Sequence, residues 1–107
     1  MTNYKYCYLF LTCKNTVEAG MITKALLEKR LVSCVKQLPV ESHAWWKGKI
    51  EHTSEVLLVM EGALELFDKV EAEVAKLHSY DTFVLEAVPV AAVSGDASKW
   101  MSETLRS

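Results

Sequence analysis

The sequence lacks both an excess of basic residues and a long apolar run. Its 107 residues include 12 Lys and Arg against 14 Asp and Glu, a formal net charge of −2, and the basic residues are scattered singly. Because phosphate backbones are bound by basic patches, no nucleic-acid partner is expected. No segment reaches the roughly 18 apolar residues of a membrane span, and the apolar stretch near the start has no small-residue cleavage site. The composition therefore predicts no membrane insertion.

The sequence contains few cysteines, and their number and spacing do not indicate disulfide bonds. The three cysteines, Cys7, Cys13 and Cys34, are odd in number and none belongs to a C-x-x-C pair. This favours free thiols in a reducing compartment, so we expect a cytoplasmic protein. We interpret all three as small buried hydrophobic residues. Cys7 and Cys13 share a face of one strand about 20 Å apart, at roughly 3.3 Å per residue, and are not expected to hold one ion.

Motifs of catalysis and of local metal chelation are also missing. No Ser-His-Asp order, nucleophile elbow, P-loop or dinucleotide fingerprint occurs, so no enzyme is expected. His43, His52 and His78 are far apart in sequence, without H-x-H or H-E-x-x-H, and we expect no local chelate. His78 follows a predicted helix, where the dipole favours an imidazolium. We expect its side chain to be partly exposed, as a helix cap or as a ligand.

What the sequence does contain is alternating strand and helix periodicity. Strands are predicted over 4–13, 31–38, 50–61 and 83–90, with a further strand-like run over 40–46. Helices are predicted over 15–30, 64–77 and from Asp96, which we expect to cap the last one. Asn15 and Glu18 form a predicted N-terminal cap, and the apolar stripe of the first helix is predicted to consist of Val17, Met21, Ile22, Ala25 and Leu26. Gly48 predicts a tight hairpin with long arms, and Pro39 a break or bulge at a sheet edge.

The order of elements defines an α+β fold. The β-α-β-β-α-β series plus a C-terminal helix, taken as one domain over 1–107, is the ferredoxin-like arrangement. Two helices cover only one face of a four-stranded sheet, whereas residues 56–60 (VLLVM) are apolar on both faces. An identical subunit is the simplest cover for the second face. The sequence therefore predicts a homo-oligomer.

Several segments together resemble the CutA divalent-cation-tolerance family. They include 31–39 (LVSCVKQLP), 45–51 (WWKGKIE), 77–81 (LHSYD) and 98–100 (SKW), and the resemblance spans nearly the whole chain. It implies a ferredoxin-like fold assembled as a tight homotrimer, similar to the nitrogen-regulatory PII signalling proteins. It also implies an association with tolerance to copper(II) and other divalent cations, and no organic cofactor.

The resemblance also assigns site residues. It implies an inter-subunit cleft containing Cys34, Trp46, Lys49, Glu55, His78 and Tyr80. Among these, His78 is favoured as a metal ligand, and the Cys34 thiol suits copper by its softness. Where the family usually reads H-P-Y-E-x-P-E, residues 78–84 read HSYDTFV. The two missing prolines are expected to leave this loop less rigid, and Val84 replaces a potential oxygen ligand.

Three functions stay open. The first is a homotrimer that binds divalent metal ions without catalysis. The second is a PII-like sensor whose cleft binds a small anion through Lys49, and the third is a purely structural trimer. An acylphosphatase on the same fold is not expected, because residues 13–19 contain neither a glycine-rich phosphate loop nor an arginine. Trp45 and Trp46 should face opposite sides of their strand, with packing at an interface as the favoured role.

Overall fold

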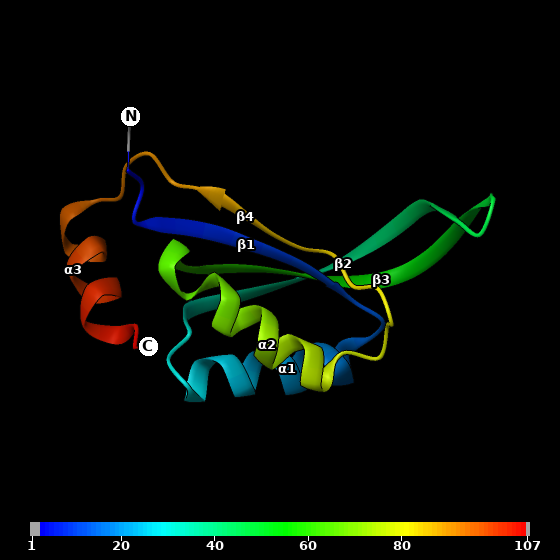
Figure 1. Ribbon diagram of the computed structural model, residues 1–107, viewed down its shortest axis with the longest axis horizontal. Helices are drawn as coiled ribbons and strands as arrows, with labels where there is room; N and C mark the ends of the chain where they lie inside the picture. Colours follow the sequence, from blue (N-terminus) through cyan, green and yellow to red (C-terminus); the bar gives the residue numbers. More distant parts are fainter. Residues whose placement is uncertain (1–2, 107) are drawn as a thin grey trace.

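The computed structural model describes residues 3–106 as a four-stranded antiparallel sheet with helices on one face (Figure 1). The strands lie in the order β2-β3-β1-β4, with bounds β1 (Tyr6–Cys13), β2 (Val32–Trp46), β3 (Lys49–Ala63) and β4 (Leu85–Pro89). The helices are α1 (Thr16–Glu28), α2 (Phe67–Leu77), preceded by a 3-10 turn (Leu64–Leu66), and α3 (Gly95–Thr104). This confirms the ferredoxin-like α+β fold.

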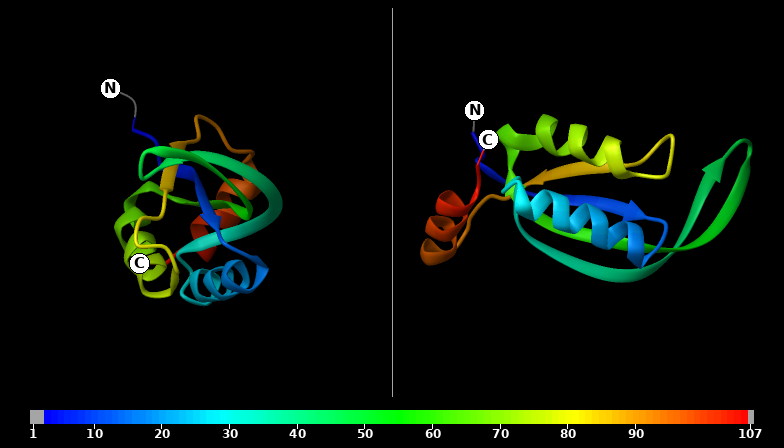
Figure 2. Two further views of the ribbon diagram at one scale, coloured as in Figure 1. Left: turned by 90° about the vertical axis from the view of Figure 1, so that its right-hand side faces the viewer. Right: turned by 90° about the horizontal axis from the view of Figure 1, so that it is seen from below.

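The core lies between the sheet and the pair α1 and α2, which run side by side beneath it (Figure 2). Alternate residues of β1 point into this layer, as the period of a strand requires. Fully buried members of the core include Cys7, Leu9, Leu11, Cys13, Ile22, Leu26, Val70 and Val74. Burial of each large aliphatic side chain contributes about 1.5–3 kcal/mol, so this layer is the main source of stability.

The opposite face of the sheet is left open by the described residues. Tyr8, Leu38 and Val88 lie on this face and are 40–48% exposed. In β1, Tyr8 alternates with the buried residues Cys7 and Leu9. The face therefore carries exposed apolar side chains beside the Lys36–Glu61 ion pair, and no described residue covers it.

Strands β2 and β3, of 15 residues each, continue past β1 as a two-stranded arm (Figures 1 and 2). The turn at its tip has positive φ at both central residues, Lys47 (50°) and Gly48 (83°). Such a turn matches the twist of the flanking strands. The predicted hairpin is thus confirmed.

The prediction of a break at Pro39 is wrong. Strand β2 runs through Pro39 opposite Val56, and the register shift lies between Val32 and Cys34. An edge strand tolerates proline where the missing N–H would point to solvent, and β2 is an edge strand.

Helix ends agree with the sequence in one case and differ in another. The Asn15 side chain accepts the Glu18 N–H at 2.9 Å, as predicted. Helix α3 instead begins after Ser94, and Asp96 lies inside its first turn and does not cap it.

On α1 the buried residues are Ala19, Ile22 and Leu26, spaced three and four apart. Val17 and Met21 therefore face solvent, against prediction. None of the described helices is long and apolar enough to cross a membrane.

Candidate functional site

A cleft of about 780 Å³ lies where the hairpin arm meets the loop that follows α2. Its walls are formed by Thr12, Ser42, Ala44, Trp45, Trp46, Glu51, Thr53, Glu55, Ser79, Tyr80, Asp81, Thr82 and Val84. Three of these are carboxylates, and none of the described wall residues is Lys or Arg. The cleft therefore has a negative potential that favours a cation over an anion.

Tyr80 closes the inner end of the cleft against the arm. Its hydroxyl donates a hydrogen bond of 2.6 Å to Glu55 Oε2. Burial raises the pKa of Tyr80, and the Glu55 carboxylate raises it further, so Tyr80 stays protonated as a donor. At the outer end Trp45 and Trp46 both line the cleft and are 73% and 46% exposed.

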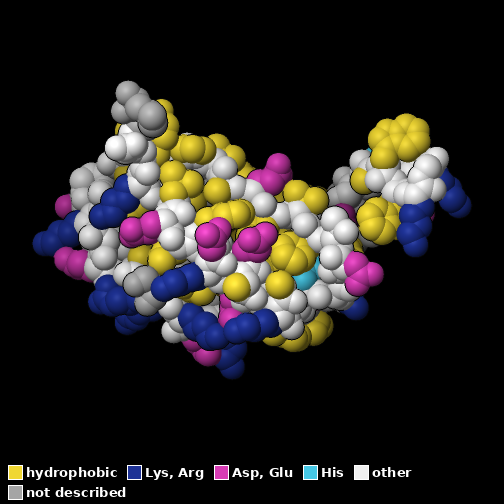
Figure 3. All heavy atoms as spheres, in the orientation of Figure 1, with side chains coloured by type: hydrophobic (Ala, Val, Ile, Leu, Met, Phe, Trp, Pro, Cys, Tyr) yellow, Lys and Arg dark blue, Asp and Glu magenta, His cyan; other side chains and the backbone are white. Residues whose placement is uncertain are grey.

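The structure brings together three of the predicted cleft residues, Trp46, Glu55 and Tyr80, as walls of one cleft. Lys49 pairs with Trp46 at the hairpin tip and is not among the wall residues. Hydrophobic side chains gather at this tip, which stands away from the body of the molecule (Figure 3).

His78 lies behind Tyr80, with its side chain fully buried. The expectation of partial exposure is wrong, because the loop after α2 folds back over the end of β1. Nε2 lies 2.8 Å from the Thr12 carbonyl oxygen, and Nδ1 lies 3.1 Å from the Tyr80 backbone nitrogen. A carbonyl only accepts and an amide N–H only donates, so the imidazole is neutral with its proton on Nε2. Both ring nitrogens are thus engaged inside the chain.

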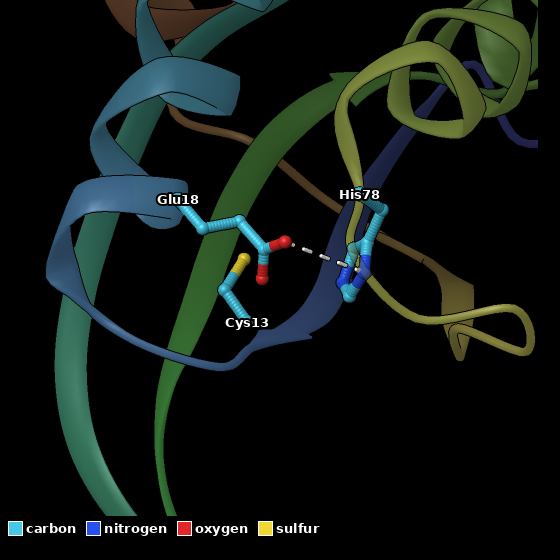
Figure 4. A group of neighbouring side chains, drawn as sticks. All are labelled: Cys13, Glu18 and His78. Carbon is cyan, nitrogen blue, oxygen red and sulfur yellow. Dashed lines mark ion pairs between the residues drawn. The ribbon is translucent and has the colours of Figure 1, made fainter.

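Cys13, Glu18 and His78 point toward one another at the end of β1 (Figure 4). One potential ligand atom from each lies within 4.8 Å of the others. Burial raises the pKa of the Cys13 thiol to about 12, with Glu18 and Glu55 adding to the effect. The set of sulfur, oxygen and nitrogen suits copper or zinc, but a metal would need to displace hydrogen bonds that already exist.

Those bonds are made by Glu18. Its Oε1 accepts the Ser79 N–H at 2.6 Å, and its Oε2 accepts the Lys14 N–H at 2.8 Å. Burial alone would raise the pKa of Glu18, but the hydrogen bonds from Ser79 and Lys14 lower it below 4.5. Sequence reasoning assigned Glu18 only to the helix cap. The short connection between β1 and α1 was the available signal that Cys13 and Glu18 are neighbours.

Cys34 lies elsewhere. It is half-buried on the open face opposite Glu61, with Lys36 Nζ 3.5 Å from its sulfur. His78 is bonded to Thr12, which pairs with Leu57 of β3. Leu57 and Glu61 are four residues apart, or about 13 Å at roughly 3.3 Å per residue. The two predicted metal ligands therefore do not meet within one chain.

Two other histidines do meet. His43 of β2 is the direct register partner of His52 of β3, and their rings stack with centroids 4.4 Å apart. The expectation that sequence separation keeps the histidines apart is wrong for this pair. A turn centred on Lys47 and Gly48 pairs residues whose numbers sum to 95. The predicted hairpin therefore already implied that His43 lies opposite His52.

Taken together, the fold and the cleft define a ferredoxin-like α+β protein with an extended hairpin and an acidic cleft. The chain belongs to the CutA1 divalent ion tolerance protein family, whose model matches residues 7–104. The divalent-cation tolerance protein CutA of Archaeoglobus fulgidus is 36% identical over 98 residues, covering 92% of this chain and 96% of that protein. Human Protein CutA is 34% identical over 99 residues, covering 92% of this chain and 55% of its own length.

A solved structure shows the same architecture. The A. fulgidus protein, described there as a periplasmic divalent cation tolerance protein CutA, superposes with a TM-score of 0.92 at 35% identity. The superposition covers 94% of this chain and 99% of that chain.

Proposed function

We propose that this protein binds divalent cations such as copper(II), without catalysis, as a homo-oligomer. The observation that carries the proposal is the charge of the cleft. Glu51, Glu55 and Asp81 line it, and none of its described wall residues is basic. A divalent cation between these carboxylates would offset their mutual repulsion, whereas an anion would add to it. Relatives named for divalent-cation tolerance support the same function.

His78 enters this proposal as a ligand reached from the cleft through Tyr80. Its Nδ1 now accepts the Tyr80 N–H, so ligation requires the start of the loop to shift. The loop lacks the two prolines expected at Ser79 and Phe83, which makes such a shift less costly. Cys34 would contribute only from another subunit, because it is remote from His78 in its own chain.

The oligomer rests on the open sheet face. Its apolar residues, including Tyr8 and Val88, have no cover from the described part of the chain. A homotrimer, as the resemblance implies, would bury them and bring clefts and neighbouring subunits together. An anion sensor using Lys49 gains less support, because Lys49 is not part of the cleft wall.

The test is a calorimetric titration of the full chain with copper(II) beside Glu55→Gln and His78→Ala. We expect one cleft ion per chain, with affinity reduced at least tenfold by either substitution. Tenfold corresponds to about 1.4 kcal/mol. Glu65→Gln, an exposed carboxylate on the turn before α2, is the control and should bind like the native chain. Light scattering on every variant checks that the oligomer persists.

Unchanged binding in both site variants would contradict a cleft site, and no cleft binding at all would favour the purely structural trimer. Loss in Glu55→Gln but not in His78→Ala would remove His78 as a ligand.

We also propose a cytoplasmic location. All three cysteines are free thiols, and Cys34 is half-buried on the open face. Cysteines that stay as free thiols are typical of proteins in a reducing compartment. Cell fractionation tests the location, and recovery from the periplasm would contradict it.

A further inference from the structure

The hairpin arm carries a second group of potential ligands, away from the cleft. His43 and His52 are register partners, and their rings are nearly parallel, with an interplanar angle of 4°. Because residues directly opposite each other project from the same face of an antiparallel pair, both imidazoles lie on one side of the arm.

A carboxylate orients one member of the pair. Glu41 Oε1 accepts a hydrogen bond from His52 Nε2 at 2.5 Å. The Ser54 hydroxyl lies 3.0 and 2.8 Å from the two Glu41 oxygens and holds the carboxylate in place. With its proton directed to Glu41 from Nε2, His52 keeps its lone pair on Nδ1. Metal-bound histidines characteristically donate their second N–H to a carboxylate in this way.

The pair lies on the opposite side of the arm from the cleft. Next to the pair, the cleft is lined by Ser42, Ala44, Glu51 and Thr53, which alternate along the strands with His43 and His52. Trp45, nearer the tip, is the one wall residue of β2 with the parity of His43. The open sheet face continues on the cleft side, since Leu57 and Val59 have the same parity as Glu51. An oligomer that covers the open face would leave the pair accessible, and the His52 side chain is 55% exposed.

We propose that His43 and His52 together bind one divalent transition-metal ion, such as Cu²⁺, Ni²⁺ or Zn²⁺, with Glu41 as a positioning residue. Imidazole nitrogen suits these ions, whereas Mg²⁺ and Ca²⁺ prefer oxygen. Metal–nitrogen bonds of about 2.0–2.1 Å hold two ligating nitrogens at most about 4.2 Å apart. The stacked rings are 4.4 Å apart between centroids, and their in-plane lone pairs are parallel. Ligation of one ion therefore requires the two exposed side chains to rotate out of the stack. Water completes the coordination.

The test is a copper(II) titration of the full chain followed by electron paramagnetic resonance. It is run in a Glu55→Gln background so that a cleft ion does not contribute. We expect a spectrum with coupling to two nitrogens, and at least tenfold weaker binding in His43→Phe and in His52→Phe, each with one nitrogen fewer. Phenylalanine keeps an aromatic ring at the cross-strand position, so the stack and the arm are retained. Glu65→Gln, an exposed carboxylate away from both sites, is the control and should leave this signal unchanged.

Two outcomes would overturn the proposal. One is native-like copper binding in the double variant His43→Phe/His52→Phe, and the other is loss of the two-nitrogen signal in Glu65→Gln. Glu41→Gln should weaken binding about 10- to 100-fold while the two-nitrogen signal persists, and Glu41→Asp should restore part of the affinity. Equal affinity in Glu41→Gln would remove Glu41 from the site. Failure of the cleft proposal would appear instead as unchanged affinity in Glu55→Gln alone.

Discussion

At the scale of single residues, Glu18 joins three segments through one carboxylate. It accepts the backbone N–H groups of Lys14 and Ser79 and lies 3.8 Å from His78 Nδ1. These partners explain how an ionised side chain is only 5% exposed. Together with His78, Glu18 holds the start of the loop that follows α2 against the end of β1.

Glu18→Gln should lower the free energy of unfolding by about 1–3 kcal/mol, because the amide cannot accept at both positions. Urea unfolding at fixed protein concentration measures this. The control is Glu28→Gln on the same helix, whose exposed contact with Lys24 at 3.8 Å should contribute well under 1 kcal/mol. Equal effects of the two substitutions would contradict the role of Glu18.

The same comparison has a defined pH dependence. The pKa of Glu18 is lower in the folded state than in the unfolded chain, so its ionised form favours folding. Its contribution is complete above the unfolded pKa, near 4.5, and is lost as the pH falls through the folded pKa. The gap between native chain and Glu18→Gln should therefore be full at neutral pH and close in acid. A gap that widens in acid would be inconsistent with this.

At the scale of elements, the arm is the feature that positions both proposed sites. Its turn determines the register of β2 against β3, and with it the partners His43–His52 and Trp46–Lys49. The alternation of strand side chains then places most cleft residues of the arm on one side and the histidine pair on the other. A one-residue slip would exchange the two sets.

Glycine substitutions test this turn. Gly48→Ala should destabilise the protein by about 1–2 kcal/mol, because φ of +83° is unfavourable for a residue with Cβ. Gly20→Ala, inside α1 with no atom within 4 Å of the added Cβ, should instead stabilise it by about 0.5–1 kcal/mol. Thermal unfolding of the two variants should thus shift in opposite directions. Shifts of the same sign would show that the turn does not require positive φ.

At the scale of the whole molecule, one face of the sheet is covered by α1 and α2 and the other is not. Tyr8, Leu38 and Val88 leave apolar area in water that no described segment of the chain buries. Burial of such area contributes about 25 cal/mol per Å² before the costs of association. This imbalance is the physical reason to expect further copies of the chain on that face.

Val88→Lys should therefore dissociate the oligomer toward the 12.1 kDa chain, measured by light scattering after size exclusion. A buried unpaired ammonium on the open face would be strongly unfavourable. Val17→Lys, at a 70% exposed position on α1, is the control and should keep the native mass. A native chain that already runs as a monomer, or an unchanged mass for Val88→Lys, would contradict the proposed interface.

The fold was largely predictable from periodicity, and the site only in part. Apolar spacing located every strand and helix, because each must bury one face or stripe. Periodicity did not predict where α3 begins or that β2 continues through Pro39. Each of these depends on the hydrogen bonding of a single backbone nitrogen, which apolar spacing does not report. The family resemblance assigned Trp46, Glu55 and Tyr80 to a cleft between subunits, and all three line the cleft of the single chain, whereas Cys34 and Lys49 lie outside its wall.

The sequence alone determined the order of elements and the pairing across the hairpin. Both are local, because a two-residue turn dictates which residues face each other. Only the tertiary structure decided that Glu18 meets Ser79, 61 residues away, and that His78 reaches Thr12, 66 residues away. These contacts depend on how α2 packs across the sheet and where the following loop returns to β1. The packing of the core determines how α2 crosses the sheet, and no local sequence pattern predicts it.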